Sequence, residues 1–346
     1  MADGPNGPVK GKSNGVAARP VVAIVGGDTL LARELREILD NLKPSPRLQL
    51  IAGSLAEGQS ANPVLTKDEE DVLVMLPLTP EILEGASVAF LAGSHASSRR
   101  TLKIASGLRL IDLTGALEDQ PNAQLRAPLV ESERPGTVPV EVIAHPAAIA
   151  LASLLARVAK SFAIRSSIAH VIEPASERGQ RGVDELQQQT VAVLSFQKLK
   201  TEVYDTQLAF SVLAQYGEEA IEPLSSIEER VQRNLAALLK SMPGIPIPSL
   251  RLIQGPVFHG HSFSLWIEFE KNPGAEAFSN ALSAAGVDVR PDEAPSNVGI
   301  AGQSGLSVGA IAADPNNARA LWLWMVADNL KLIAENAVAV AKETML

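Results

Sequence analysis

The 346-residue chain contains no cysteine, so it cannot supply a thiolate nucleophile. Disulfides, thiolate metal sites and every mechanism that begins with attack by a thiolate are therefore excluded. The groups that could still transfer a proton include five histidines, whose ordinary pKa lies near neutrality.

A turn with two glycines follows the first apolar run and could hold a phosphate group. Residues 21–25 read VVAIV, as expected for a strand buried on both faces. Gly26, Gly27, Asp28 and Thr29 turn the chain, and helical spacing of leucines begins at Leu30. Glycines permit the tight turn of a dinucleotide-binding loop, and the helix N-terminus would face the pyrophosphate.

The elements around this turn alternate between strands and helices. We expect strands at 47–53, 71–76, 87–91 and 108–113, and helices at 30–42 and 97–107. This alternation is typical of a parallel, doubly wound sheet. It predicts an α/β protein whose residues 20–145 form an N-terminal Rossmann-like domain.

The pattern changes from His145 onward. We expect helices at 147–162, 182–199 and 227–239, strands at 164–172, 257–258 and 263–269, and an apolar closing helix over 317–342. The second half is therefore predicted to be an α+β domain over 146–315, followed by a C-terminal segment, 316–346, that carries the closing helix.

Composition and charge narrow the range of partners. The chain is 46% hydrophobic and carries 30 Lys and Arg against 39 Asp and Glu. This acidic, dispersed balance argues against a surface for nucleic acid or anionic membranes. Residues 1–19 are rich in Gly, Pro, Lys and Asn and are predicted to be a disordered tail. No apolar stretch reaches the roughly 18 residues of a membrane span, so we expect a cytoplasmic protein.

Further segments follow one another in a recognisable order. They are 25–35, 88–94, 110–112, 143–146, 182–186, 207–210, 256–262 and 321–330. Together they resemble the aspartate-semialdehyde dehydrogenase family. The resemblance implies an NADP-binding Rossmann domain, a second domain that dimerises through its sheet, and a final helix that packs back on the first domain.

The resemblance also implies a reaction and a set of residues for it. Enzymes of the family form a thioester from an aldehyde, pass hydride to NADP and release an acyl phosphate. Ala148 stands at the position of the nucleophilic cysteine, and Glu173 replaces a glutamine that places the intermediate. Gln254 replaces an arginine that binds the substrate carboxylate, whereas His261 retains the acid–base histidine.

Other anion-binding positions are changed as well. Glu118 and Ala310 replace arginines, and residues 226–229 contain no lysine where the family has one. An alanine cannot form a covalent intermediate, and a carboxylate would repel phosphate. We therefore expect a catalytically inactive homodimer that acts as a scaffold or regulatory partner. A paralogue or another protein is a further candidate partner.

The cofactor loop is altered less severely. Thr29 and Ala32 replace the second and third glycines of the loop, Asp28 adds a negative charge, and Leu113 replaces an asparagine near the nicotinamide. The candidate cofactor contacts are Gly26, Gly27, Thr29, Leu30 and Gly93. NADP binding stays open, so a sensor of the dinucleotide or a residual NADP-dependent semialdehyde dehydrogenase is the alternative function.

A metal site is a further alternative at the family's catalytic position. His145, Glu173 and His261 could converge there, and two imidazoles with a carboxylate suit zinc or iron. Scattered polar residues in a disused cleft are the simpler interpretation, and we expect no metal.

Overall fold

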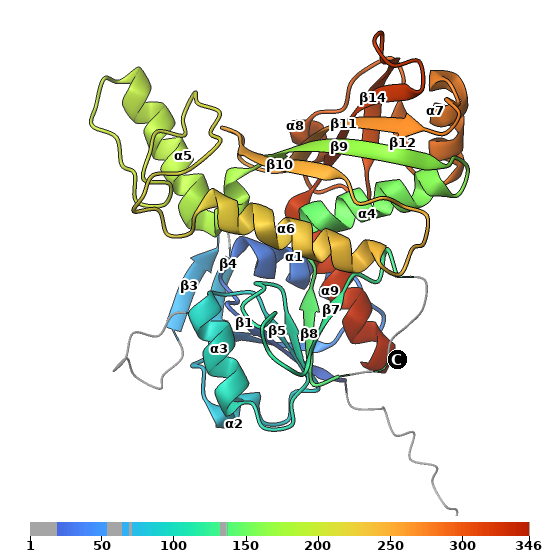
Figure 1. Cartoon of the computed structure of the whole chain (residues 1–346). Helices are drawn as coiled ribbons and strands as arrows, with labels where there is room; N and C mark the ends of the chain where they lie inside the picture. Colours follow the sequence, from blue (N-terminus) through green and yellow to red (C-terminus); the bar gives the residue numbers. More distant parts are fainter. Residues whose placement is uncertain (1–18, 54–63, 69–70, 132–135, 137, 346) are drawn as a thin grey trace, which may run out of the picture.

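A computed structural model describes residues 19–53, 64–68, 71–131, 136 and 138–345 (Figure 1). The tail predicted for residues 1–19 therefore lies outside the described residues, apart from Arg19.

The N-terminal part is built on a parallel sheet. Within the described residues it has six strands in the order β2-β1-β5-β6-β8-β7, and every neighbouring pair is parallel. The strands are β1 (Val21–Val25), β2 (Arg47–Ile51), β5 (Val88–Leu91), β6 (Leu110–Asp112), β7 (Ala123–Arg126) and β8 (Val140–Ile143). The predicted doubly wound α/β architecture is confirmed.

The side chains of β1 alternate between two apolar cores, one on each face of the sheet. Val22 and Ile24 pack in the core that includes helix α1 (Leu30–Asp40), whereas Ala23 and Val25 pack in a second core against helix α3 (His95–Ile104). Successive side chains of a strand point to opposite faces, so both residue sets must be apolar.

The segment predicted as a strand at 71–76 does not join this sheet. It forms β4 (Asp71–Met75), which pairs antiparallel with β3 (Val64–Asp68) in a separate two-stranded sheet. A bridge between Ile51 and Leu76, the residue after β4, connects this small sheet to the edge of the main sheet. The short helix α2 (Pro80–Leu83) follows.

The second part of the chain has a mixed sheet with helices against one face (Figure 1). In the described part, its strand order is β10-β9-β11-β14-β13-β12. The strands are β9 (Ile164–Glu173), β10 (Ser249–Gln254), β11 (His261–Phe269), β12 (Asp288–Arg290), β13 (Ser307–Ala313) and β14 (Ala320–Ala327). The helices are α4 (Pro146–Ala159), α5 (Gly179–Leu194), α6 (Leu224–Leu239), α7 (Ala275–Ala284) and α8 (Asn297–Ile300). Helices α4 and α6 lie between this sheet and the N-terminal part.

The prediction of one closing helix over 317–342 is wrong in its first part. Residues 320–327 form strand β14, and helix α9 (Asn329–Met345) begins only after it. Along β14 the residues Leu321, Leu323 and Met325 are buried, whereas Trp322 and Trp324 are more exposed. This period of two is that of a strand, and an apolar run of this length does not distinguish the two structures by composition.

The strand predicted at 257–258 is absent as well. The carbonyl groups of Val257 and Phe258 accept hydrogen bonds from the backbone N–H groups of Ala175 and Ser176, which belong to a 3-10 turn (Ala175–Arg178). These carbonyl groups therefore bond to that turn and not to a neighbouring strand, and strand β11 starts only at His261.

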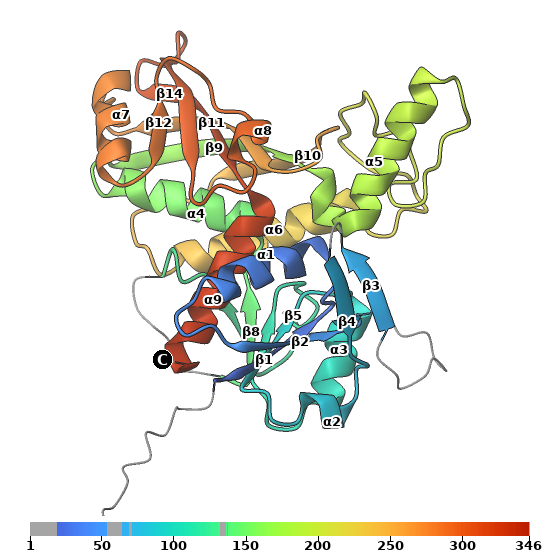
Figure 2. The same cartoon turned by 180° about the vertical axis from the view of Figure 1, so that it is seen from behind.

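Helix α9 returns to the N-terminal part, as expected, and lies beside α1 (Figure 2). Lys331 forms ion pairs with Glu34 (3.4 Å) and Glu37 (3.1 Å) of α1. Near the other end, Glu343 pairs with Arg126 at 2.7 Å. In the part of the chain that the structure describes, no helix is long and apolar enough to cross a membrane.

Candidate functional site

The first turn of α4 carries Ala148, the residue that the family resemblance places at the nucleophile position. His145 is the N-cap residue, Pro146 opens the helix, and the Nδ1 atom of His145 accepts the N–H of Ala147 at 3.2 Å. Ala148 follows in this turn and is fully buried. Its methyl group can neither attack a carbonyl group nor accept a proton.

The two histidines of the site are brought together but are shielded from solvent. The rings of His145 and His261 lie 5.8 Å apart, and each residue is 1% exposed. Burial lowers the pKa of His145 well below its ordinary value and also lowers the pKa of His261. Both imidazoles are therefore neutral at neutral pH, and neither Nε2 atom has a hydrogen-bond partner within the described residues.

Glu177 is the acidic residue nearest to this pair. One of its carboxylate oxygens lies 3.5 Å from Nε2 of His145. Its other oxygen accepts a hydrogen bond from the side-chain amide of Asn329 at 2.8 Å. The first residues of α9 therefore reach into the site.

Glu173 ends strand β9 and is fully buried. Its Oε1 atom lies 3.2 Å from the guanidinium of Arg178, which also pairs with Glu222 at 2.6 Å. Burial raises the pKa of Glu173 to about 8, and the charge of Arg178 opposes this rise only in part. The carboxyl group thus belongs to an internal charge cluster and does not project towards a substrate.

Gln254 ends the neighbouring strand β10 and lies opposite Glu173 in the ladder. Its amide nitrogen donates to the carbonyl groups of Glu173 (2.8 Å) and Gly255 (2.9 Å), and its oxygen accepts the hydroxyl of Tyr216 (2.6 Å). Both amide protons are used by these bonds. Gln254 therefore joins backbone segments and has no donor left for a substrate carboxylate.

Glu118, which the resemblance places at a phosphate-binding position, forms a second internal ion pair. Glu118 accepts a hydrogen bond from Nε of Arg230 at 2.9 Å, and Arg230 packs so closely on Gly115 that a Cβ there would lie 2.4 Å from its Cζ atom. Asn234 of the same helix accepts the backbone N–H of His145 at 2.8 Å. The guanidinium near the site is thus held by a carboxylate.

The remaining predicted positions do not reach the cluster. Ala310 has a positive φ of 49° at the register shift of β13 and is exposed. Leu113 is buried, and its N–H donates to Leu91 in the sheet.

The sequence did not identify Arg178, Glu177, Tyr216 and Arg230 as parts of this site. Arg230 directly follows residues 226–229, where the family has a lysine. Arg178 ends the turn after β9 and lies five positions beyond Glu173, and this proximity in sequence could have indicated that the two side chains meet. Tyr216 lies 38 positions from Gln254, and no local pattern indicates that contact.

The dinucleotide loop keeps its tight turn. Gly26 has a φ of 85°, a conformation that favours glycine. The N–H groups of Gly26 and Gly27 donate to the carbonyl of Ile51 at 2.8 and 3.1 Å. These two donors are engaged inside the protein.

Thr29 is the N-cap residue of α1, and Leu30 is the first residue of that helix. The Oγ1 atom of Thr29 accepts the N–H of Ala32 at 3.1 Å and lies 2.9 Å from the carbonyl of Ala92. The side chain therefore links the helix start to the end of β5, where Gly93 follows. Asp28 is exposed at the same turn.

The metal hypothesis is not supported by the arrangement of side chains. Among the described residues, no group of three or more His, Asp or Glu side chains is placed to hold a metal ion. His145, Glu173 and His261 are therefore not a ligand set, because Glu173 is directed to Arg178.

Comparison with known proteins identifies the family of the chain. Residues 21–136 match the family described as semialdehyde dehydrogenase, NAD binding domain, and residues 155–332 match semialdehyde dehydrogenase, dimerisation domain. The chain belongs to the semialdehyde dehydrogenase family.

Individual relatives cover almost the whole chain. A USG-1 protein homolog of Pseudomonas aeruginosa is 30% identical over 92% of this chain and 95% of its own length. An aspartate-semialdehyde dehydrogenase of Prochlorococcus marinus is 26% identical over 94% and 96%. The solved structure of a probable aspartate-semialdehyde dehydrogenase from Pseudomonas aeruginosa superimposes with a TM-score of 0.81 at 28% identity, covering 94% and 98%. The family resemblance expected from the sequence is confirmed.

The raised pKa of Glu173 in this semialdehyde dehydrogenase relative predicts a pH-dependent stability. Its ordinary value is 4.5 and its folded value about 8, so between these values the folded protein holds a proton that the unfolded chain has released. The resulting stabilisation is complete below pH 4.5 and is lost as the pH rises towards 8. We expect the unfolding free energy, measured relative to Glu173→Gln by urea titration, to fall by on the order of 2 kcal/mol between pH 6 and 8.

The histidines occur in both proteins, so their titration cancels in this difference. The exposed Glu229 provides a matched control, and Glu229→Gln should follow the pH dependence of the unmodified protein. A difference between the unmodified protein and Glu173→Gln that does not change with pH would contradict a protonated Glu173.

Proposed function

We propose that this chain is a non-catalytic member of the semialdehyde dehydrogenase family that works as a homodimeric scaffold or regulatory partner. The observation that carries the proposal is the fully buried Ala148 beside His145 and His261, in a chain without cysteine. The thioester chemistry implied by the family requires a thiolate at this place. A histidine that is retained without a nucleophile has no thiol to deprotonate.

The charges around Ala148 support the same proposal. Arg178 contacts the buried carboxyl group of Glu173 and is neutralised by Glu222, and Arg230 is neutralised by Glu118. A substrate with a carboxylate or phosphate would have to displace these carboxylates from partly or fully buried pairs, and breaking such pairs is costly. The site is therefore stabilised as protein interior.

The first test is turnover. With aspartate semialdehyde, phosphate and NADP, we expect no NADPH formation above the uncatalysed rate, measured by absorbance at high protein concentration. The Bacillus subtilis aspartate-semialdehyde dehydrogenase, a 26% identical relative, serves as the positive control. The variant Ala148→Cys should recover little activity, because Gln254, Glu118 and Ala310 still lack the cationic groups for the two anions.

Turnover by the unmodified protein would overturn the proposal in favour of a residual dehydrogenase. Substantial recovery in Ala148→Cys would mean that the changed anion-binding positions matter less than proposed.

We propose further that the dinucleotide loop is retained as scaffold. The fit to a pyrophosphate is poor, because Gly26 and Gly27 already donate to Ile51 and the Thr29 side chain occupies the loop. The exposed carboxylate of Asp28 would face a phosphate as well, and opposes the attraction of the helix N-terminus.

Calorimetric titration with NADPH measures this directly. We expect no binding at micromolar cofactor, with any dissociation constant on the order of 1 mM or weaker. The variant Thr29→Gly removes the side chain at a small cost in helix capping and should bind more tightly than the unmodified protein. Micromolar binding by the unmodified protein would replace the scaffold proposal with that of a dinucleotide sensor.

The homodimer is supported by the outer face of the mixed sheet. Ile168, Trp266 and Trp322 are cross-strand neighbours on β9, β11 and β14. Ile168 is 38% and Trp322 37% exposed, and α4 lies on the other side of the sheet. A row of large apolar side chains across three strands is typical of an interface, and a second copy of the chain fits the matched dimerisation domain.

Substitution in this row should separate the subunits. We expect Ile168→Lys to change the mass measured by light scattering from that of a dimer to that of a single chain, because two lysines would approach across the two-fold axis. Ile247→Lys introduces the same charge at an exposed isoleucine outside the sheet and should remain dimeric. A dimeric Ile168→Lys would show that the subunits meet elsewhere.

A further inference from the structure

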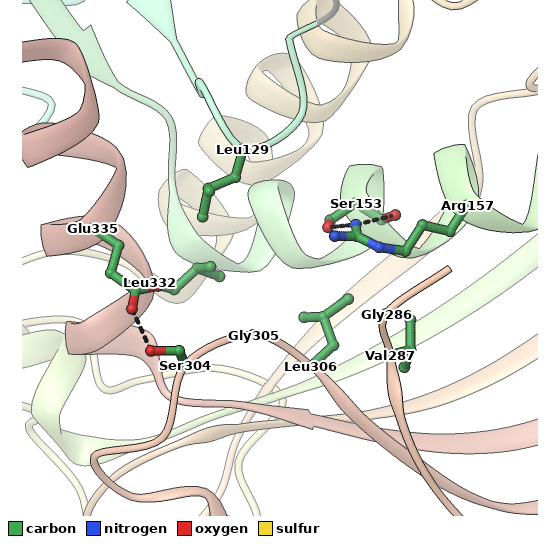
Figure 3. Close-up of a pocket in the computed structure, with 10 residues that line it drawn as sticks. All are labelled: Leu129, Ser153, Arg157, Gly286, Val287, Ser304, Gly305, Leu306, Leu332 and Glu335. Carbon is green, nitrogen blue, oxygen red and sulfur yellow. Dashed lines mark hydrogen bonds between the residues drawn. The ribbon is translucent and has the colours of Figure 1, made fainter. Parts of the chain in front are cut away.

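A cavity of about 240 Å³ lies between the two parts of the chain (Figure 3). Its walls come from α4, α9, the loop after β7 and the loops before β12 and β13. The lining residues that matter here are Leu129, Arg157, Val287, Leu306, Leu332 and Glu335. None of them belongs to the cluster around Ala148.

Arg157 of α4 provides a cation without a counter-ion. Its Nε atom donates to the carbonyl of Ala285 at 3.2 Å, and its Nη1 atom donates to the carbonyl of Ser153 at 2.9 Å and to the Ser153 hydroxyl. No carboxylate among the described residues forms an ion pair with it. The buried guanidinium groups of Arg126 and Arg178 both have carboxylate partners, so Arg157 differs from them.

Glu335 of α9 provides an anion on another wall of the cavity. It accepts a hydrogen bond from the hydroxyl of Ser304, and within the described residues no Lys, Arg or His pairs with it. Arg157 and Glu335 are not paired with each other either. Figure 3 shows the two charged groups apart, with the side chain of Leu332 between them and Leu129 beside it.

We propose that this cavity binds a small zwitterion, namely an ω-amino acid whose carboxylate and ammonium group stand at opposite ends of an apolar chain. The guanidinium of Arg157 pairs with the carboxylate of the ligand, and Glu335 pairs with its ammonium group. The leucines and Val287 pack against the apolar chain between the two charges. Pockets for drug-sized ligands hold about 300–1,000 Å³, so this cavity is too small for a nucleotide.

Binding here would join the two parts of the protein. Leu129 and α9 belong to the N-terminal side, whereas α4 and Leu306 belong to the side of the mixed sheet. A ligand that contacts both sides stabilises their relative arrangement and raises the unfolding temperature through mass action.

The experiment uses the full chain, thermal unfolding and calorimetry, with the ω-amino acids 5-aminopentanoate and 6-aminohexanoate as probes. The comparison ligands are pentanoate and hexanoate, which lack the ammonium group, and pentylamine and hexylamine, which lack the carboxylate. We expect at least one amino acid to bind, and its two singly charged analogues to bind at least about tenfold more weakly. No binding of any tested amino acid at about 10 mM overturns the proposal, as does equal affinity for the singly charged analogues.

Substitutions then assign the site. Glu335→Gln keeps an acceptor for the Ser304 hydroxyl and should weaken amino-acid binding at least about tenfold, leaving binding of the carboxylate analogue unchanged. Arg157→Lys keeps the charge but loses the planar fork, and should weaken both ligands. Lys160→Gln removes an exposed charge at the end of the same helix and should bind as the unmodified protein does. Normal binding by Glu335→Gln would overturn the proposal. The result is independent of turnover and of NADPH binding.

Discussion

The fully buried guanidinium of Arg126 ties the end of the chain to the first sheet. A buried charge is tolerated only with partners, and these are Glu141 on β8 (2.5 Å), Glu131 in the loop after β7 (3.0 Å) and Glu343 near the end of α9 (2.7 Å). Through Glu343, helix α9 is anchored to the N-terminal part after the last strand of the mixed sheet. Its first residue, Asn329, is then fixed where its side chain donates to Glu177 beside the two histidines. Helix α9 thus connects the Arg126–Glu343 ion pair at one end to the candidate site at the other.

The substitutions at the site are compensated by other residues of this chain. Glu118 neutralises Arg230, and Glu173 lies against Arg178, whose charge is balanced by Glu222. Single changes of this kind would leave an unpaired charge in the interior, with a cost of several kcal/mol. Compensation is incomplete at Oε2 of Glu173 and at Nε2 of His261, which have no partner within the described residues. The cluster is therefore buried, although not all of its polar atoms have hydrogen-bond partners within the described residues.

Local patterns predicted much of the fold but little of the site's polar pairing. The apolar run at 21–25 and the helical spacing after Leu30 are short-range signals, and both elements form as expected. The run with Trp322 and Trp324 predicts a helix but forms strand β14, because length and composition do not separate a buried strand from a helix. Glu173 was expected to face a substrate. Its side chain instead contacts Arg178, which the turn after β9 brings close to it. Such side-chain directions depend on tertiary packing, which a local sequence pattern does not describe.

The glycines of the dinucleotide loop have a structural reason to persist that does not involve a cofactor. A Cβ on Gly26 would lie 2.3 Å from the Cα of Gly93, and a Cβ on Gly53 would lie 3.1 Å from the Cα of Gly26. Three backbone segments therefore meet at the ends of β1, β2 and β5 at a distance that only glycine allows. Within the same loop, the position of Thr29 faces no such contact and carries a side chain that caps α1. The glycines that remain are those required by backbone packing, so their presence is explained by the fold and does not by itself indicate that a dinucleotide binds.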